Sequence, residues 1–436
     1  MIHTIDLRGL KPSRAELLAL VPRSLTDVSA ATAIAQDLIT DVRKRGEVAL
    51  LDQAERLDGV RPRRVRIDVA DVTAAVRALS VPVRDALEEA IVRVRAASEA
   101  QLPTPRITIL GPGAEVIQRW SPVARVGLYV PGGKAVYPSS VVMNVVPAQV
   151  AGVSSVAIAS PAQRQFDGSI HPTILGAAGL LGIDEIYAMG GAGAIGAFAW
   201  GVPGLHLDPV QVITGPGNVY VAAAKRIVRS QVGIDAEAGP TEIMVIADAT
   251  ADPTLVATDL ISQAEHDELA AAVLVTDSVR LADRVQAELG RLAPLTPHST
   301  RVDISLRGIQ SAVVLVDNMA AAAEFSNVYG PEHLEIQTAD PEEMLDLIES
   351  AGAIFLGAHS PVSLGDYLAG SNHVLPTGGQ ARFTPGLGAH TFLRPQQVIR
   401  YSREALRAVE DKVVALATAE NLPAHAAAVT ARFIEP

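Results

Sequence analysis

Short apolar runs alternate with segments of helix length along most of the chain, and no other feature of the sequence constrains the fold as strongly. The runs are rich in Val and Ile and nearly continuously apolar, which is typical of parallel strands covered by helices on both faces. The alternation predicts an α/β fold with mostly parallel sheets, with helices at 83–100, 219–230, 254–268 and 402–420. The predicted strands are 126–130, 155–160, 185–190, 210–214, 243–248, 271–277, 311–317 and 353–357.

Composition excludes several classes of protein and of site. The 436 residues include no Cys, which rules out disulfides, thiolate-bound metals and a cysteine nucleophile. The net charge of −12, from 36 Lys and Arg against 48 Asp and Glu, argues against binding to nucleic acid. The N-terminus is polar, and apolar stretches such as 172–183 are shorter than the roughly 20 residues of a membrane span. We therefore expect a cytoplasmic protein without a signal peptide or a membrane segment.

Glycine-rich turns follow three of the predicted strands, at 131–133, 190–193 and 215–218. Ligands of open α/β sheets bind at the carboxyl ends of the strands, so these turns favour a nucleotide-sized ligand there. Residues 191–196 also match the G-x-G-x-x-G dinucleotide pattern, but Asp208, the nearest acidic partner, precedes the next strand instead of ending it. The alternative is that the glycines only allow a tight turn and close helix packing.

A group of candidate metal ligands lies in the predicted helix 254–268. Asp259, Gln263 and His266 fall at positions i, i+4 and i+7, on one face of that helix. Zinc accepts His nitrogen and carboxylate or amide oxygen, and later segments offer further ligands of these types at Asp366, His373 and His425. The spacing is not a recognisable zinc motif, so a solvated or salt-bridged helix surface is the alternative.

The adjacent pair Glu332 and His333 is a candidate for acid–base chemistry. In a loop after Gly330 and Pro331, both side chains can face one cleft. His is a general base near neutral pH, and a neighbouring carboxylate can activate water. The alternative is that Glu332 and His333 are adjacent in a turn by chance and have no catalytic role.

Taken together, seven ordered segments resemble the histidinol dehydrogenase family, and the likeness covers essentially the whole chain. They are VGLYVPGG (126–133), GPGN (215–218), AGPTEIMVIAD (238–248), DLISQAEHD (259–267), GPEHLEI (330–336), GDYLAGSNHVLP (365–376) and AENLPAH (419–425).

The resemblance implies NAD-dependent, four-electron oxidation of L-histidinol through L-histidinaldehyde to L-histidine. It also implies a homodimer with shared active sites and a zinc ion that grips and orients the substrate. The implied metal ligands are Gln263, His266, Asp366 and, from the swapped C-terminal tail of the neighbouring subunit, His425.

The resemblance further implies a role for each remaining site residue. His333 is the general base, and Glu332 activates the water that hydrates the aldehyde. Tyr129 and Asn218 contact NAD. The implied substrate contacts are Thr241, Gln263, His266, His333, Asp366, Glu420 and His425.

One position departs from the family pattern. Gly193 stands where the family usually carries a glutamine that contacts NAD. Loss of one neutral hydrogen bond costs on the order of 1 kcal/mol, which weakens NAD binding up to about tenfold without abolishing it. The match to G-x-G-x-x-G is then an accident of the lost glutamine.

The family fold implies two incomplete Rossmann-like domains. We expect an N-terminal arm at 1–27 and a first domain of 28–126 with 242–385, which carries the metal and catalytic residues. Residues 127–241 form the NAD-contacting second domain, and 386–436 form the tail that reaches the partner subunit. Two alternatives stay open, a dehydrogenase of another small polar alcohol and a non-catalytic binding paralogue.

Overall fold

The computed structural model describes residues 2–23, 28–132, 136–237 and 239–434, so Gly133 and residue 238 of the quoted segments lie outside the described residues. The chain divides into two compact units, Met1–Gln101 with Ala124–Phe392, and Leu102–Val123 with Leu393–Pro436. The larger unit contains a six-stranded and a five-stranded sheet, and the smaller unit contains a three-stranded sheet. The two sheets of the larger unit are parallel, which confirms the expected α/β fold with mostly parallel sheets.

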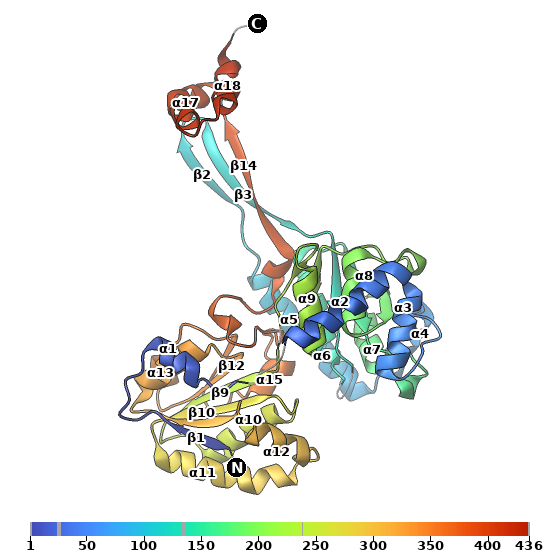
Figure 1. Ribbon diagram of the computed structural model, residues 1–436, viewed down its shortest axis with the longest axis vertical. Coiled ribbons are helices and arrows are strands. Elements are labelled where there is room, and N and C mark those ends of the chain that lie inside the picture. The colour runs from blue at the N-terminus through green and yellow to red at the C-terminus, as the bar shows by residue number, and fades with distance from the viewer. Residues whose placement is uncertain (1, 24–27, 133–135, 238, 435–436) are drawn as a thin grey trace. The chain divides into compact units, whose positions relative to one another are not determined.

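The six-stranded sheet is buried between two layers of helices (Figure 1). Its strands are, in spatial order, β1 (His3–Asp6), β11 (Ala312–Leu315), β10 (Ala271–Thr276), β9 (Glu242–Ala247), β12 (His333–Gln337) and β13 (Ala353–Leu356). One face packs on α10 (Pro253–Ala264), α11 (Val279–Leu292) and α12 (Ser299–Arg307). The other packs on α1 (Arg14–Leu20) and α13 (Met319–Tyr329).

The five-stranded sheet has its own helices. Its spatial order is β6 (Ile186–Ala188), β5 (Ser155–Ser160), β4 (Arg125–Tyr129), β7 (Val212–Thr214) and β8 (Gly233–Ile234). One apolar cluster joins its strands to α2 (Val28–Arg45), α3 (Glu47–Gln53), α8 (Gly191–Trp200) and α9 (Val219–Val228). Elsewhere α4 (Val69–Ala78) packs on α7 (Pro172–Leu180), and α5 (Val81–Ala100) packs on α6 (Pro138–Ala151).

Each of the eight predicted strands overlaps an observed strand. Continuous runs of Val and Ile favour strands and are buried when helices cover both faces of the sheet. Two strands of the six-stranded sheet were not predicted. Strand β12 was not predicted because three of its five residues, His333, Glu335 and Gln337, are polar, although all five are buried. Strand β1 is a four-residue edge strand with three exposed residues.

The packing of the N-terminal helices differs from the expected grouping. Helices α2 to α5 pack on helices of the five-stranded sheet, namely α6, α7, α8 and α9, whereas the sequence grouped residues 28–126 with the segment 242–385. Residues 3–6 of the expected N-terminal arm pair with β11. The predicted domain boundaries remain a prediction.

The smaller unit is antiparallel. Strand β14 (Leu393–Tyr401) pairs with β3 (Ala114–Pro122), which also pairs with β2 (Arg106–Gly111). The predicted helix 402–420 is divided into α16 (Arg403–Arg407) and α17 (Glu410–Ala419), and α18 (Pro423–Thr430) follows. Among the described residues, no helix combines the length and the apolar character that a membrane span requires.

Candidate active site

The catalytic candidates lie at the amino edge of the six-stranded sheet. Helix α13 ends at Tyr329 and is capped by Gly330, whose positive φ of 59° is a conformation that glycine adopts readily, and β12 begins at His333. Parallel pairing places His333 opposite Ile243 of β9 and Ala353 of β13. His333 is therefore the first residue of a strand, whereas we expected both members of the pair to lie in a loop.

Glu332 is held by two neighbouring groups. Its Oε2 accepts hydrogen bonds from Thr241 Oγ1 at 2.6 Å and from the backbone N–H of Glu242 at 2.8 Å. Thr241 Oγ1 in turn accepts from Gln263 Nε2 at 2.7 Å. Burial raises the pKa of the Glu332 carboxyl to about 7, although the bonds from Thr241 and Glu242 lower it. Near neutral pH this group can therefore both take up and release a proton.

His333 has the tautomer of a general base. Its Nδ1 lies 3.0 Å from the carbonyl oxygen of Glu242, and because a carbonyl only accepts, Nδ1 carries the hydrogen. The lone pair is then on Nε2, which is buried and has no hydrogen-bond partner among the described residues. Burial lowers the pKa of the imidazole, so the neutral form is present at neutral pH. Glu332 Oε2 lies 3.5 Å from Nδ1 of the same ring.

Two of the expected metal ligands share one face of this site with Glu332. Helix α10 ends at Ala264, so Gln263 lies in its last turn, and His266 lies just beyond the helix. His266 Nδ1 is 3.2 Å from the carbonyl oxygen of Ser262, which leaves Nε2 free for a ligand. Asp259 belongs elsewhere, because Gln337 Nε2 donates to its Oδ2 at 3.3 Å.

Asp366, on α15 (Val362–Tyr367), completes this part of the site. Its carboxylate raises the pKa of Glu332 and opposes the burial that lowers the pKa of His333 and His373. His373 Nδ1 is 2.9 Å from the carbonyl oxygen of Asp366, and its Nε2 is 3.0 Å from Ser140 Oγ on α6. Both nitrogens of His373 are therefore used, so this residue positions Asp366 and is not free to bind a metal.

The remaining expected ligands belong to the smaller unit. Glu420 and His425 are both exposed and flank the turn between α17 and α18. Within the described ranges, no three or more His, Asp or Glu side chains form a group that could hold a metal ion. The larger unit thus offers an amide, an imidazole and a carboxylate at Gln263, His266 and Asp366, and a four-coordinate zinc site needs one more ligand.

The cofactor candidates lie at the opposite, carboxyl edge of the five-stranded sheet. Tyr129 is the last residue of β4, and its hydroxyl accepts the N–H of Gly191 at 3.1 Å, at the start of α8. Asn218 caps α9 through its Oδ1, which accepts the N–H of Tyr220 at 3.0 Å. Gly215 has a φ of 112°, and a Cβ at this position would lie 1.9 Å from the carbonyl oxygen of Tyr129.

The G-x-G-x-x-G glycines lie within α8, and helix packing explains Gly193 and Gly196, whereas Gly191 has a positive φ of 57° and nothing within 4 Å of its Cβ position. A Cβ on Gly193 would lie 2.2 Å from Gln53 Oε1, and a Cβ on Gly196 would lie 3.3 Å from the Cα of Ile39. Gln53 is buried, and its Nε2 donates to the carbonyl oxygen of Leu38 at 3.1 Å. A carboxamide from α3 therefore occupies the space into which a side chain at position 193 would project.

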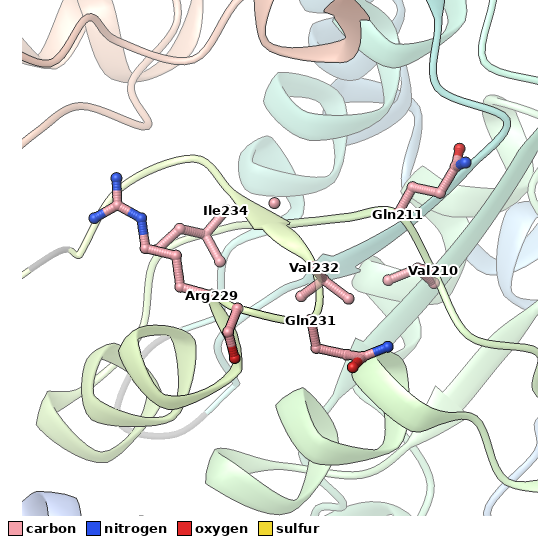
Figure 2. Close-up of a pocket in the computed structure, with 8 residues that line it drawn as sticks. Val210, Gln211, Arg229, Gln231, Val232 and Ile234 are labelled. Carbon is pink, nitrogen blue, oxygen red and sulfur yellow. The ribbon is translucent and has the colours of Figure 1, made fainter. Parts of the chain in front are cut away.

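A surface hollow of about 490 Å³ lies at the amino ends of β7 and β8, so it is not at the carboxyl edge that carries the cofactor candidates (Figure 2). It is lined by Val210 and Gln211, which precede β7, and by residues 229–234, which lead into β8. Of the described residues that line it, Arg229 alone is ionisable, and it lies 3.9 Å from Glu237. The hollow offers no acid–base group, so we do not assign the reaction to it.

Comparison with known proteins decides the family. The sequence profile of histidinol dehydrogenase matches residues 21–433. The chain belongs to the histidinol dehydrogenase family. The histidinol dehydrogenase of Leifsonia xyli subsp. xyli is 69% identical over 434 residues, 100% of each chain. That of Mycobacterium tuberculosis is 56% identical, over 99% of this chain and 98% of its own.

A crystal structure agrees with this assignment. The histidinol dehydrogenase of Elizabethkingia anophelis has a TM-score of 0.92 at 32% identity, over 99% of this chain and 98% of its own. The chain is thus an oxidoreductase of the histidinol dehydrogenase family.

Sequence reasoning missed two residues of this histidinol dehydrogenase site. Glu242, whose backbone contacts both Glu332 and His333, lay in the segment 238–248 but outside the predicted strand 243–248, and no role was predicted for it. A carboxylate at the start of a buried strand was the available signal, because such a group needs a partner. Gln53, next to Gly193, lies 140 positions away in an amphipathic segment and carried no signal.

Proposed function

We propose that the protein oxidises L-histidinol through L-histidinaldehyde to L-histidine, the last steps of histidine biosynthesis, in the cytoplasm. The observation that carries the proposal is the state of His333. Its Nδ1–H is fixed on a carbonyl oxygen and lies 3.5 Å from the held carboxyl of Glu332, and its buried Nε2 has no hydrogen-bond partner among the described residues. A neutral base next to a water-activating carboxyl is what successive alcohol and aldehyde oxidation requires.

The chain's own groups handle the protons of both steps. NAD, when bound, accepts one hydride in each step. His333 Nε2 takes the hydroxyl proton as the hydride leaves the alcohol carbon. Glu332 then removes a proton from water so that its oxygen adds to the aldehyde carbon, and protonated His333 returns its proton to the carbonyl oxygen, which completes the hydrate. Neutral His333 deprotonates this hydrate as the second hydride leaves, and both residues then release their protons to water. No thioester is needed, in agreement with a chain that has no Cys.

The donor set fits zinc. Gln263, His266 and Asp366 would supply amide oxygen, imidazole nitrogen and carboxylate oxygen, and His425 of a second copy would supply the fourth ligand. Gln263 Nε2 is already bound to Thr241, which leaves its oxygen for the metal. Zinc, when bound, provides a fixed charge that orients the amine and imidazole of the substrate. Thr241 and, from the second copy, Glu420 would complete the substrate contacts.

The cofactor would lie along Tyr129, the first turn of α8 at Gly193, and Asn218. Support comes from their shared position at the carboxyl ends of β4, β6 and β7, where α/β sheets bind ligands. The carboxamide of Gln53 lies where a glutamine at position 193 would begin, and its Nε2 donates to the carbonyl oxygen of Leu38.

The exposed apolar surface of the smaller unit supports a homodimer with shared sites. Its strands and helices expose the large apolar side chains of Ile107, Ile109, Leu110, Ile399 and Leu416. Exposed apolar side chains of this number mark a surface that another chain covers. Its few buried apolar residues, Ala114, Val123, Ala405 and Ala417, are small.

The direct test is NADH formation from L-histidinol by the zinc-loaded protein. We expect two NADH per histidinol and histidine as the product. NADH from a different small polar alcohol in a substrate panel would replace the proposed substrate, and no NAD binding at all would favour a non-catalytic paralogue.

Shared sites can be tested by subunit mixing. His333→Ala and His425→Ala homodimers should both be inactive, whereas random reassociation of the two should restore about a quarter of wild-type activity, since half of the dimers then hold one intact site. No recovery would contradict a metal ligand donated across the dimer.

A further inference from the structure

Glu242 is the residue at this site that the proposed reaction leaves without a role. It begins β9, is 5% exposed, and its side chain is directed away from the metal ligands named above, toward Arg23 and Tyr329. Its Oε2 has no hydrogen-bond partner among the described residues. A buried carboxyl is costly to keep unless it is paired or hydrogen-bonded, so the groups that hold Glu242 need an explanation.

The backbone of Glu242 holds both members of the catalytic pair. Its N–H donates to Glu332 Oε2 at 2.8 Å, and its carbonyl oxygen accepts from His333 Nδ1 at 3.0 Å. The first bond fixes one oxygen of the carboxyl, and the second fixes the imidazole tautomer. A shift of residue 242 would therefore misplace Glu332 and His333 together.

The side chain of Glu242 is in turn held by a cation. Arg23 Nη1 lies 3.7 Å from Glu242 Oε1, and the Arg23 guanidinium lies 4.2 Å from the centre of the Tyr329 ring and donates to the Tyr329 carbonyl oxygen. Hydrogen bonding from the backbone of Gly378 and Glu332 also reaches the Glu242 carboxyl. Gly379 makes room for the guanidinium, because a Cβ there would lie 2.7 Å from Arg23 Nη1.

We propose that Glu242, anchored by Arg23, is a positioning residue that keeps Glu332 and His333 in place for proton transfer. The inference rests on the proposed function, because it assigns Glu242 to the same reaction.

Charges around Glu242 give the proposal a pH signature. The groups that face it are Arg23 from the segment after α1, Tyr329 from α13 and Glu332 before β12, and Arg382 lies beyond Arg23. Burial raises the pKa of Glu242 to about 7, Arg23 lowers it and Glu332 raises it. Because the repulsion is mutual, loss of the charge on Glu242 lowers the pKa of Glu332.

The kinetic test compares Glu242→Gln with Glu335→Gln in the zinc-loaded enzyme. Glu335 is a matched control, since it is a buried carboxyl on the neighbouring strand β12, and one of its oxygens has no hydrogen-bond partner in the described part of the chain. We expect Glu242→Gln to lower kcat about tenfold, with the KM for histidinol and NAD within about twofold, as slight misplacement of a catalytic group does. The pH limb of kcat that belongs to Glu332 should move to lower pH, and Glu335→Gln should leave that limb in place. An unmoved limb, or a change in KM alone, would overturn the proposal.

The contact between Arg23 and Glu242 can be tested by unfolding, without an activity assay. The result then does not depend on whether the proposed reaction is correct. Arg23→Met should raise the unfolding equilibrium constant about tenfold, because it leaves a buried carboxylate without its cation. In the double variant with Glu242→Gln, this effect of Arg23→Met should shrink at least about fivefold. Additive effects in this double-mutant cycle, measured by urea unfolding at pH 8, would show that Arg23 does not anchor Glu242.

Discussion

The two parallel sheets of the larger unit place their functional candidates at opposite edges. In the five-stranded sheet, Tyr129 and the turns that follow β6 and β7 lie at the carboxyl ends of strands, where ligands of α/β sheets usually bind. In the six-stranded sheet, Glu242 and His333 are the first residues of β9 and β12, at the amino ends. The cofactor candidates therefore follow the common rule, and the acid–base candidates do not.

The two edges differ because they offer different chemical groups to a ligand or a side chain. A carboxyl edge offers glycine turns and free N–H groups at helix starts, which suit a phosphate-bearing cofactor. The amino edge of the six-stranded sheet offers the backbone groups of Glu242, which fix a carboxyl and an imidazole inside the core. Contact between the edges is made through His373, which touches both Asp366 and Ser140 at the start of α6.

The largest effect is expected at the amino edge. His333→Gln removes the basic nitrogen but keeps a polar side chain, and kcat should fall by about 10²–10⁴, the usual contribution of a general base. NAD affinity, followed by fluorescence titration, should not change, because Tyr129 and Asn218 are untouched. A large loss of NAD affinity would instead show that His333, at the amino edge, also contributes to cofactor binding.

At the carboxyl edge, substitution of Gly193 should affect stability first. Gly193→Ala places a methyl group 2.2 Å from Gln53 Oε1 and should lower the free energy of unfolding by about 1–3 kcal/mol through overpacking. Gly290→Ala is the control, because this glycine lies in α11 with nothing within 4 Å, and the change should be neutral or stabilising by up to about 1 kcal/mol. Urea unfolding of both variants would decide, and equal effects would contradict the packing argument.

A smaller effect separates capping from cofactor binding. Asn218→Ala and Asn318→Ala each remove an N-cap, of α9 and α13, and each should cost about 1 kcal/mol of stability. We expect the KM for NAD to rise several-fold in Asn218→Ala alone, since Asn318 belongs to the other sheet. A similar rise in both variants would remove the case for Asn218 as a cofactor contact.

The smallest effect is a pH dependence confined to the six-stranded sheet. Burial, followed by the charge of Asp259, raises the pKa of Glu335 above its ordinary value of 4.5. The native state then holds a proton that the unfolded state releases, so this contribution to stability is present below about pH 4.5 and is lost as pH rises toward the native pKa. Glu335→Gln should flatten the curve and gain on the order of 1 kcal/mol over wild type between about pH 5 and 8. Parallel curves for the two proteins would show that Glu335 ionises normally.

Much of the fold could be predicted from the sequence because buried parallel strands consist of continuous runs of apolar residues. Every predicted strand overlaps an observed one, and the resemblance placed Glu332 with His333 and Gln263 with Asp366 before any geometry was known. Strand β12 was missed because its buried polar residues look like a loop, and the antiparallel strands β2, β3 and β14 were missed because they are half-exposed.

The sequence by itself determined the α/β class, the family and the types of side chain available for chemistry, since these depend on local pattern and on ordered motifs. Only the tertiary structure decided that the acid–base pair lies at the amino ends of strands and that Glu242 holds both of its members. It also decided that Gln53 fills the space beside Gly193. The physical reason is that strand register and helix packing join residues roughly 90 to 140 positions apart, and no local pattern in the chain encodes such a distance.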